Sequence, residues 1–454
     1  MSLAVRQILD MNAFDASQDV GTANPLLHRR QQNFGPISVL FYREPLEMVR
    51  ASGCWIESAD GKRYLDFYNN VPSVGHCHPR VVAAISRQVA TLNINSRYLH
   101  QTTEEYLERL KTTLPPHLNN VAMSCSGSEA NDLALRVARK VTGGNGFIVT
   151  QTAYHGNTQA VTEISPSAYK QGNPPDHVCL IKAPGLDAYG EDIGSGMAKA
   201  VARAIRTLKK RGHDLGGLIC DSIFSSDGIF SDPPGFLRES VDLVHKAGGL
   251  YIADEVQPGF ARTGDSFWGF GRHRLDPDIV TMGKPMGNGF PMAAMVAPTD
   301  AMAAFCRDVG YFNTFGGTPA AAAAGLAVLE VIEEEHLQEN ALKVGTHLQQ
   351  GLLKLAKKDP RISDVRGAGL FIGIDLGKAT SPHPPDPTLA SAVINGLRDR
   401  QVLIGAAGRF GHTLKVRPPL CLNKAEANFF LDALKSTLQS IPPSESDRRR
   451  RKSM

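Results

Sequence analysis

Alternating short apolar runs and helix-like segments in the middle of the chain constrain its fold most strongly. Helical patterns at residues 129–141, 196–209 and 234–246 separate the apolar runs. Seven runs have strand length: residues 121–124, 147–150, 178–181, 218–220, 250–254, 279–282 and 293–297. Strands flanked by helices predict an α/β fold with a largely parallel sheet, covered on both faces and binding ligands at the carboxyl ends of its strands.

The pattern changes after about residue 320. A long helical stretch reaches residue 357, and helices are expected at 389–400 and 425–441, with apolar strands at 369–375 and 413–416. This predicts a smaller α+β domain. We expect residues 1–60 to form an N-terminal segment that packs with this small domain, 61–318 the large domain, 319–441 the small domain and 442–454 a disordered basic tail. The Pro-rich insert 381–387 is expected to be an exposed loop.

Composition places the chain among ordinary soluble proteins. Its 454 residues are 42% hydrophobic and 21% charged, with a net charge of +4 to which the run Arg448–Lys452 contributes. Such a run is more often a solvated end than a nucleic-acid or membrane contact. The longest apolar stretch, 319–332, is too short to cross a bilayer. Seven cysteines without a CxxC pair favour a reducing compartment, so we expect a cytoplasmic protein.

A turn containing serine and glycine precedes the first central helix. Ser126 follows the expected strand 121–124, and Glu129 stands three residues later, which is the pattern of a capping box. Gly127 and Ser128 would lie in the first turn, where free backbone N–H groups and the helix dipole favour a phosphate. A capped helix without a ligand is the commoner outcome, so both interpretations stay open at this point.

Two carboxylates end another apolar run. Asp254 and Glu255 follow residues 251–253, at the carboxyl end of an expected central strand. Burying an acid costs free energy unless a cation or hydrogen-bond donor meets it, which makes the position a candidate site. A salt bridge at the sheet edge is the structural alternative.

A lysine ends the apolar strand 279–282 and opens a loop rich in glycine and proline. Lys284 is the residue concerned, in the segment Gly283-Lys284-Pro285-Met286-Gly287. Partial burial would lower the pKa of its amine and make it a better nucleophile for carbonyl chemistry. A lysine that buries only its aliphatic stem is the alternative.

The three motifs together fit one ligand. The lysine would react with an aldehyde, the carboxylate would pair with a protonated ring nitrogen, and the helix start would bind a phosphate. Pyridoxal 5'-phosphate carries all three groups. An ionised Asp254 would hold the proton on the ring nitrogen, which the ring needs in order to accept electrons from a substrate carbanion.

Segments along nearly the whole chain strengthen this interpretation. They include residues 61–66 (GKRYLD), 75–79 (GHCHP) and 414–419 (LKVRPP). With them, the sequence resembles the class III aminotransferases, which are fold type I enzymes that bind pyridoxal phosphate. Residues 95–100, 126–136 and 164–166 also resemble a branch of this family that contains ethanolamine-phosphate phospho-lyases.

The resemblance implies roles for individual residues around the cofactor ring. Lys284 looks like the lysine that holds the cofactor as a Schiff base and carries the proton between the substrate carbon and C4'. Asp254 looks like the partner of the ring nitrogen, and Gln257 like the donor to the ring hydroxyl. Tyr154 resembles the aromatic residue that stacks on the ring.

The resemblance also implies how the phosphate is held. Gly127 and Ser128 would cradle it, and Thr314 would reach it from the neighbouring subunit, so a homodimer with shared active sites is implied. The cluster His76-Cys77-His78 marks a turn in this family, and no metal site is expected.

Three positions depart from the wider family and concern the substrate. Lys415 stands where many members carry an arginine for a substrate carboxylate, with Arg417 two residues further on, and Asp221 replaces a usual glutamate. Phe290 stands where the phospho-lyase branch more often has histidine. We therefore predict a ping-pong aminotransferase acting on small amines and carbonyl compounds. A phospho-lyase acting on ethanolamine phosphate is second, and a non-catalytic cofactor-binding protein is a distant third.

Overall fold

The computed structural model describes residues 4–8, 10–15, 24–37, 39–379 and 384–442. Residues 443–454 of the predicted basic tail and residues 381–383 of the Pro-rich insert lie outside this part of the chain. Within it, no helix combines the length and apolar character needed to cross a membrane.

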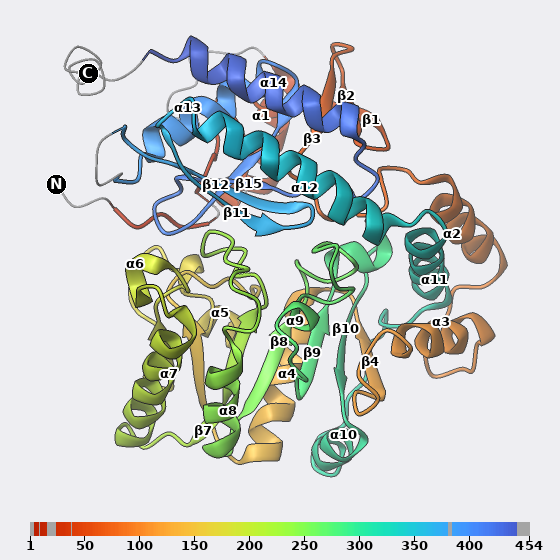
Figure 1. The fold of residues 1–454 in the computed structure, drawn as a ribbon. Coiled ribbons are helices and arrows are strands. Elements are labelled where there is room, and N and C mark those ends of the chain that lie inside the picture. The colour runs from red at the N-terminus through yellow and green to blue at the C-terminus, as the bar shows by residue number, and fades with distance from the viewer. Residues whose placement is uncertain (1–3, 9, 16–23, 38, 380–383, 443–454) are drawn as a thin grey trace.

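A seven-stranded sheet forms the centre of the large domain (Figure 1). All seven predicted strands are confirmed, with ends that differ by at most three residues. Only β10 runs antiparallel to its two neighbours, so the sheet is mostly parallel, as expected. In spatial order the strands are β4 (Asn120–Ser124), β10 (Ala293–Ala297), β9 (Ile279–Met282), β8 (Leu250–Asp254), β7 (Leu215–Asp221), β5 (Gly146–Thr150) and β6 (Val178–Ile181).

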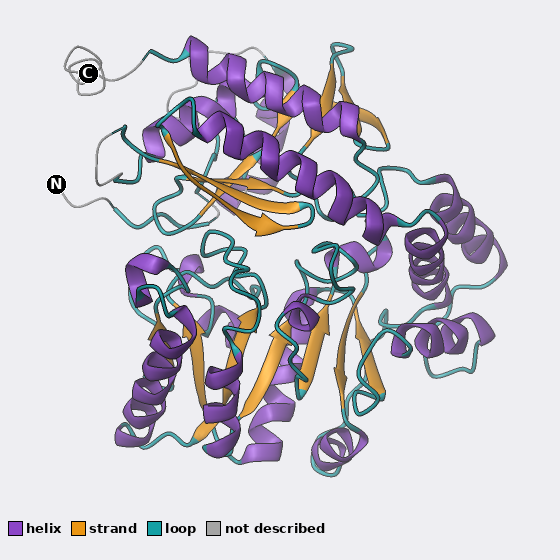
Figure 2. Ribbon diagram, in the orientation of Figure 1, coloured by secondary structure: helices purple, strands orange, loops and turns teal. Residues whose placement is uncertain are grey.

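Helices cover both faces of this sheet (Figure 2). On β8, Ile252 packs in the core cluster that contains the buried face of α4 (Gly127–Thr142), whereas Tyr251 and Ala253 pack in the cluster beneath α7 (Ile193–Lys210) and α8 (Arg238–Lys246). Successive side chains on a strand point to opposite faces, so a strand buried on both sides is apolar without interruption.

The predicted start of α8 at residue 234 is wrong by four residues. The helix begins at Arg238, because Gly235 has a φ of +88° and therefore lies in a turn outside the helical region.

The C-terminal part contains an antiparallel sheet in the order β11 (Ile362–Ala368), β12 (Phe371–Leu376), β15 (Thr413–Val416) and β14 (Gly405–Ala407). The predicted continuous helix from 319 to 357 is in fact two helices, α11 (Pro319–Glu334) and α12 (Leu337–Ala356), separated at His336 by a φ of +51°. The strand expected from residue 369 begins at Phe371, because Gly369 (φ +53°) forms the turn after β11. Helices α13 (Pro387–Arg398) and α14 (Lys424–Ser440) complete this part.

A third sheet joins residues from the two ends of the chain. Its order is β1 (Met48–Ser52), β2 (Trp55–Ser58), β3 (Arg63–Asp66) and β13 (Val402–Leu403), and β13 runs parallel to β3. Nearby, the Phe67 and Phe430 rings stack with centroids 4.2 Å apart. This sheet was not predicted from the sequence, and the domain boundaries 1–60, 61–318 and 319–441 stay a proposal.

The remaining helices lie at the periphery or connect the strands, and α2 and α3 pack against α11 (Figure 1). They are α1 (Pro25–Phe34), α2 (Pro79–Thr91), α3 (Gln101–Lys111), α5 (Gln159–Glu163), α6 (Leu186–Tyr189), α9 (Gly269–Arg272) and α10 (Thr299–Cys306).

Candidate active site

The three predicted motifs meet at the carboxyl ends of the central strands. A Cβ atom built on Gly283, next to Lys284, would lie 3.4 Å from the Gly127 nitrogen. A Cβ atom on Gly127 would lie 2.9 Å from Cγ2 of Val256, two residues after Asp254. The helix start, the acidic strand end and the lysine loop are therefore packed against one another, and the contact at Gly127 is too close for a side chain.

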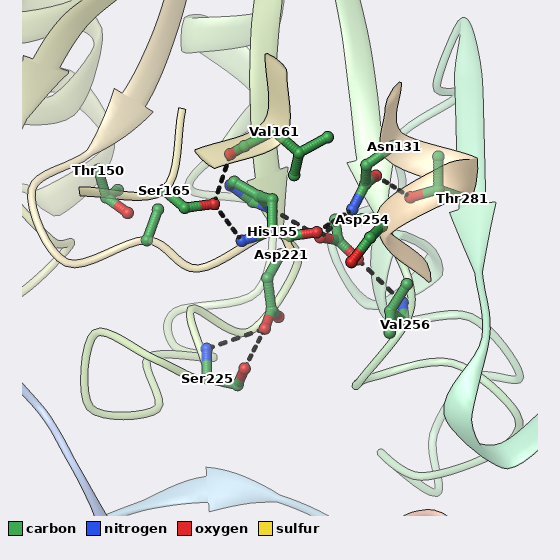
Figure 3. A network of polar contacts seen from close by, with 12 residues as sticks. Asn131, Thr150, His155, Val161, Ser165, Asp221, Ser225, Asp254, Val256 and Thr281 are labelled. Atoms are coloured by element: carbon green, nitrogen blue, oxygen red, sulfur yellow. Dashed lines mark hydrogen bonds and ion pairs between the residues drawn. The ribbon is translucent and has the colours of Figure 1, made fainter. Parts of the chain in front are cut away.

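Asp254 is buried at the end of β8 among three donors (Figure 3). Its Oδ2 lies 2.6 Å from His155 Nδ1 and 3.1 Å from Asn131 Nδ2. Its Oδ1 accepts a hydrogen bond from the Val256 backbone N–H at 3.1 Å. These contacts fix the orientation of the carboxylate and stabilise a negative charge on it.

A second layer of hydrogen bonds holds the partners of Asp254 (Figure 3). Thr281 Oγ1 donates to Asn131 Oδ1 at 2.6 Å, which turns the Asn131 amide so that its nitrogen faces Asp254 and the His155 carbonyl. The His155 backbone N–H donates to Ser165 Oγ at 2.9 Å. Neither Asn131 nor His155 was predicted from the sequence to belong to the site. Only the fold brings them to the carboxylate.

Lys284 begins the short 3-10 helix η4 (Lys284–Gly287) directly beyond β9. Its side chain is partly buried, and desolvation lowers the pKa of its amine. The positive charge of Arg417 lowers this pKa further, against the opposing charges of Asp254 and Asp221. Its φ of +29° is unusual for a residue with a side chain, and such strain is typical of functional sites. The amine is thus better able to act as a nucleophile at neutral pH.

The start of α4 carries the predicted cap, with one difference. Ser126 Oγ accepts from the Glu129 N–H at 3.3 Å, as expected, but the Glu129 carboxylate accepts from the Cys125 N–H at 3.0 Å and not from that of Ser126. Gly127 and Ser128 form the first turn, and Ser128 Oγ accepts from the Asn157 N–H at 3.1 Å. The backbone N–H groups of this turn provide an anion-binding helix terminus.

The other predicted cofactor residues differ in their surroundings. Tyr154 is half-buried in the loop after β5, and burial raises the pKa of its hydroxyl. Gln257 is buried beyond β8, and its Oε1 accepts from Arg417 Nη1 at 2.7 Å. Thr314 is exposed in the segment before α11. Within a single chain, Thr314 therefore faces outward.

The three substrate candidates come from two strands, since Asp221 ends β7, Lys415 lies on β15 and Arg417 directly follows β15. Asp221 ends β7 opposite Asp254 in the strand register, and its carboxylate accepts from the Ile223 N–H at 2.9 Å. Burial raises the pKa of Asp221. Lys415 is buried on β15, and both its burial and the charge of Arg417 lower the pKa of its amine. Lys415, Arg417 and Lys284 therefore lie close enough together for the charge of Arg417 to lower the pKa of both lysine amines.

The histidines of the predicted turn have separate partners. His76 Nε2 lies 2.7 Å from Asp66 Oδ2, and His78 Nε2 lies 3.0 Å from Glu335 Oε1. Each histidine thus has a carboxylate of its own.

The donor set of the site fits pyridoxal phosphate. The buried carboxylate would suit a ring nitrogen, the lysine with the lowered pKa would suit an aldehyde, and the start of the capped helix would suit a phosphate. The family model described as aminotransferase class-III matches residues 42–438. The chain belongs to the class III aminotransferases. Enzymes of this family depend on pyridoxal phosphate, so the predicted family, fold and cofactor are confirmed.

Individual relatives of this class III aminotransferase include both reaction types. It is 39% identical to the Drosophila melanogaster alanine–glyoxylate aminotransferase 2-like protein, over 91% of this chain and 86% of the relative. It is 38% identical to alanine–glyoxylate aminotransferase 2 homolog 2, mitochondrial, of Arabidopsis thaliana, over 92% and 88%. A solved phospholyase from Arthrobacter in complex with phosphoethanolamine is 40% identical, with a TM-score of 0.88 over 92% of this chain and all of that one.

A buried acid beside the site makes stability depend on pH. Burial raises the pKa of Asp227 to about 6, although hydrogen bonds from Thr150 and Thr152 oppose the shift. The folded protein then holds a proton that the unfolded chain, with a carboxyl pKa near 3.9, has released, so the free energy of unfolding falls as pH rises between about 4 and 6. We expect this loss, about 3 kcal/mol, to be absent in Asp227→Asn.

The expected result is that the melting temperature of the wild type falls relative to that of Asp227→Asn between pH 4 and pH 7. Melting curves of both proteins at half-unit pH steps measure the difference. If the melting temperatures of the two proteins changed with pH in parallel, the pKa of Asp227 would not be raised in the folded protein.

Proposed function

We propose that this chain is a ping-pong aminotransferase, which moves an amino group from an amine or amino acid to a keto or aldehyde acceptor. The observation that carries this proposal is the partly buried Lys284 with its lowered pKa, which follows the contact of Gly283 with the helix start at Gly127 and lies within the influence of the Asp254 charge. A nucleophilic amine, an anion for a ring nitrogen and a phosphate site in one place are the requirements of pyridoxal phosphate chemistry.

Lys284 and Asp254 take the two chemical roles. When bound, pyridoxal phosphate supplies an electron-withdrawing ring that stabilises negative charge on the substrate carbon. Lys284 would hold the aldehyde group of the cofactor through Nζ, and its free amine would carry the proton released from the substrate carbon. Asp254 keeps the ring nitrogen protonated, while His155 and Asn131 hold its carboxylate in place.

Four further residues position the cofactor in this proposal. The first-turn N–H groups of Gly127 and Ser128 bind the phosphate. Tyr154 stacks on the ring, and Gln257 donates to the ring oxygen.

The substrate pocket is proposed to contain Lys415, Arg417 and Asp221. Two buried basic side chains, Lys415 and Arg417, favour a substrate with an anionic group, either a carboxylate or a phosphate. The similarity to the phospholyase that binds phosphoethanolamine favours the second candidate function, elimination of phosphate from a phosphorylated amine.

Two incubations separate these reactions. The cofactor-loaded protein is mixed with alanine or a simple amine in one arm and with phosphoethanolamine in the other. Accumulation of pyridoxamine phosphate supports amino transfer, whereas released inorganic phosphate and acetaldehyde support elimination. If no amine changes the cofactor spectrum, the protein binds its cofactor without catalysis.

A homodimer with shared sites is part of the proposal. Exposed apolar side chains gather around Thr314, since Leu99 is 96% and Phe315 70% exposed. The Arg97 guanidinium lies 4.1 Å from the centre of the Phe312 ring, which places the two segments side by side. Large exposed apolar groups of this kind mark protein interfaces, and an interface here would bring Thr314 to the site of the second subunit.

Leu99→Asp is expected to convert the dimer to a monomer and to weaken cofactor binding, because a charge would be buried in the interface. Light scattering coupled to size exclusion measures the mass, and titration with pyridoxal phosphate measures the affinity. Leu186→Asp, at another strongly exposed leucine (65%), is the control and should stay dimeric. A Leu99→Asp protein that remains a dimer would place the interface elsewhere.

We propose the cytoplasm as the compartment, supported by seven free cysteines, two of which, Cys54 and Cys421, have their sulfur atoms 3.6 Å apart. A fluorescent fusion of the full chain tests this, and accumulation in mitochondria would overturn it.

A further inference from the structure

Arg417 contacts two buried carboxamides at the edge of the site. Its Nη1 donates to Gln257 Oε1 at 2.7 Å and to Asn70 Oδ1 at 3.3 Å. The guanidinium lies 4.5 Å from the centre of the Tyr68 ring, and the Arg417 backbone N–H donates to the Phe67 carbonyl at 3.0 Å. The guanidinium is therefore held on several sides by the chain itself.

The chemistry of these groups determines how the Gln257 amide is turned. A guanidinium has only donors, so the atom that faces Arg417 must be the amide oxygen. The amide nitrogen of Gln257 then points away from Arg417. Without the Arg417 guanidinium, the oxygen and the nitrogen of the Gln257 amide could exchange places at this contact.

Unpaired donors at the same place indicate that this corner meets a ligand. Asn70 Nδ2 and Arg417 Nε are buried and have no hydrogen-bond partner among the described residues. Buried donors are rarely left unpaired in folded proteins. An oxygen-rich group bound beside them would pair them.

Charge effects place Arg417 within reach of the reacting groups. Its positive charge lowers the pKa of Lys284, of Lys415 and of Arg262. Asp254 and Asp221 are the anions that oppose its effect on Lys284. Arg417 is thus close enough to these groups for its charge to influence their protonation.

We infer that Arg417 is a positioning residue, which fixes the Gln257 amide with its oxygen on the guanidinium and its nitrogen toward the cofactor ring oxygen, while Asn70 completes the anchor. This inference rests on the proposed function. It assigns Arg417 a further role, through Gln257, beside its place in the proposed substrate pocket.

A double-mutant cycle tests whether Arg417 acts through Gln257. Arg417→Met, Gln257→Leu and the double variant are loaded with pyridoxal phosphate, and the pH midpoint of the visible absorption change is measured for each. Each single substitution is expected to raise the midpoint, by about one pH unit, because a cation or a donor near the ring oxygen is lost. The double variant should shift it by clearly less than the two single shifts together.

The possible outcomes distinguish a positioning role of Arg417, a direct charge effect of Arg417 and a failure of the proposed function. A direct charge effect of Arg417 would be the same with or without Gln257, so additive shifts would overturn the inference. A midpoint that stays raised in Arg417→Lys, which keeps the charge but not the planar guanidinium, supports it, because a direct charge effect would be restored. The exposed Arg87→Met is the control and should leave the midpoint unchanged. A wild-type protein without a visible band would instead reject the proposed function.

Discussion

Lys284→Ala is expected to abolish both amino transfer and the visible absorption of covalently held cofactor. The alanine has no amine to bind the aldehyde or to carry the proton, so turnover should fall by at least about 10⁴-fold, the upper range for a general acid–base group. The partly buried side chain has a lowered pKa in the folded protein, so the variant loses an amine prepared for this chemistry. Single-turnover kinetics and the absorption spectrum of the loaded variant measure the two effects.

A matched control separates loss of chemistry from loss of fold. Lys199 lies exposed on α7, and Lys199→Ala should keep wild-type turnover and spectrum. Borohydride reduction followed by peptide mapping gives a second test, since the label should appear at residue 284 alone. Labelling of another lysine, or an unchanged band in Lys284→Ala, would refute the assignment of the site.

Asp254→Asn is expected to reduce turnover by about 10³-fold while cofactor still binds. The substitution keeps the shape of the side chain but removes the negative charge that balances a protonated ring nitrogen. It also places an amide NH₂ either at the Oδ2 position, facing His155 Nδ1 and Asn131 Nδ2, or at the Oδ1 position, facing the Val256 N–H. In both orientations at least one donor faces a mismatched partner. Stopped-flow measurement of proton removal from a deuterated substrate would show that this step has become slower.

The control for this variant is Asp242→Asn on the exposed face of α8, which should behave as the wild type. Rescue of the Asp254→Asn protein by a cofactor analogue with a permanent positive charge on the ring nitrogen would support the assigned role. Turnover within about twofold of the wild type, below the usual contribution of such a group, would contradict it.

The central sheet could be predicted because burial on both faces makes its strands apolar without interruption. Residues 250–253 form such a run, and the acid that ends it breaks the pattern at the point where the site lies. Lys284 was predictable for the same reason, as a charge at the end of the buried strand β9. Signals of this kind are local in sequence, so one chain is enough to find them.

Contacts between distant segments could not be predicted. His155 reaches Asp254, and Asn131 is turned by Thr281, through pairings that depend on how β8, β9 and α4 assemble. The start of α8 depends on the backbone angle at Gly235, which composition alone leaves open. These features follow from the packing of the whole domain, which local patterns do not encode.

The parallel pairing of Leu65 on β3 with Val402 on β13 has a consequence for biosynthesis. Ribosomes add about 5–20 residues per second, so the early strands wait tens of seconds before their partner has been translated. During that interval β3 presents an open strand edge, the kind of surface on which nascent chains associate with one another. The order of translation thus makes the closing of this sheet a late event. We therefore expect the newly made chain to bind chaperones that shield open strand edges.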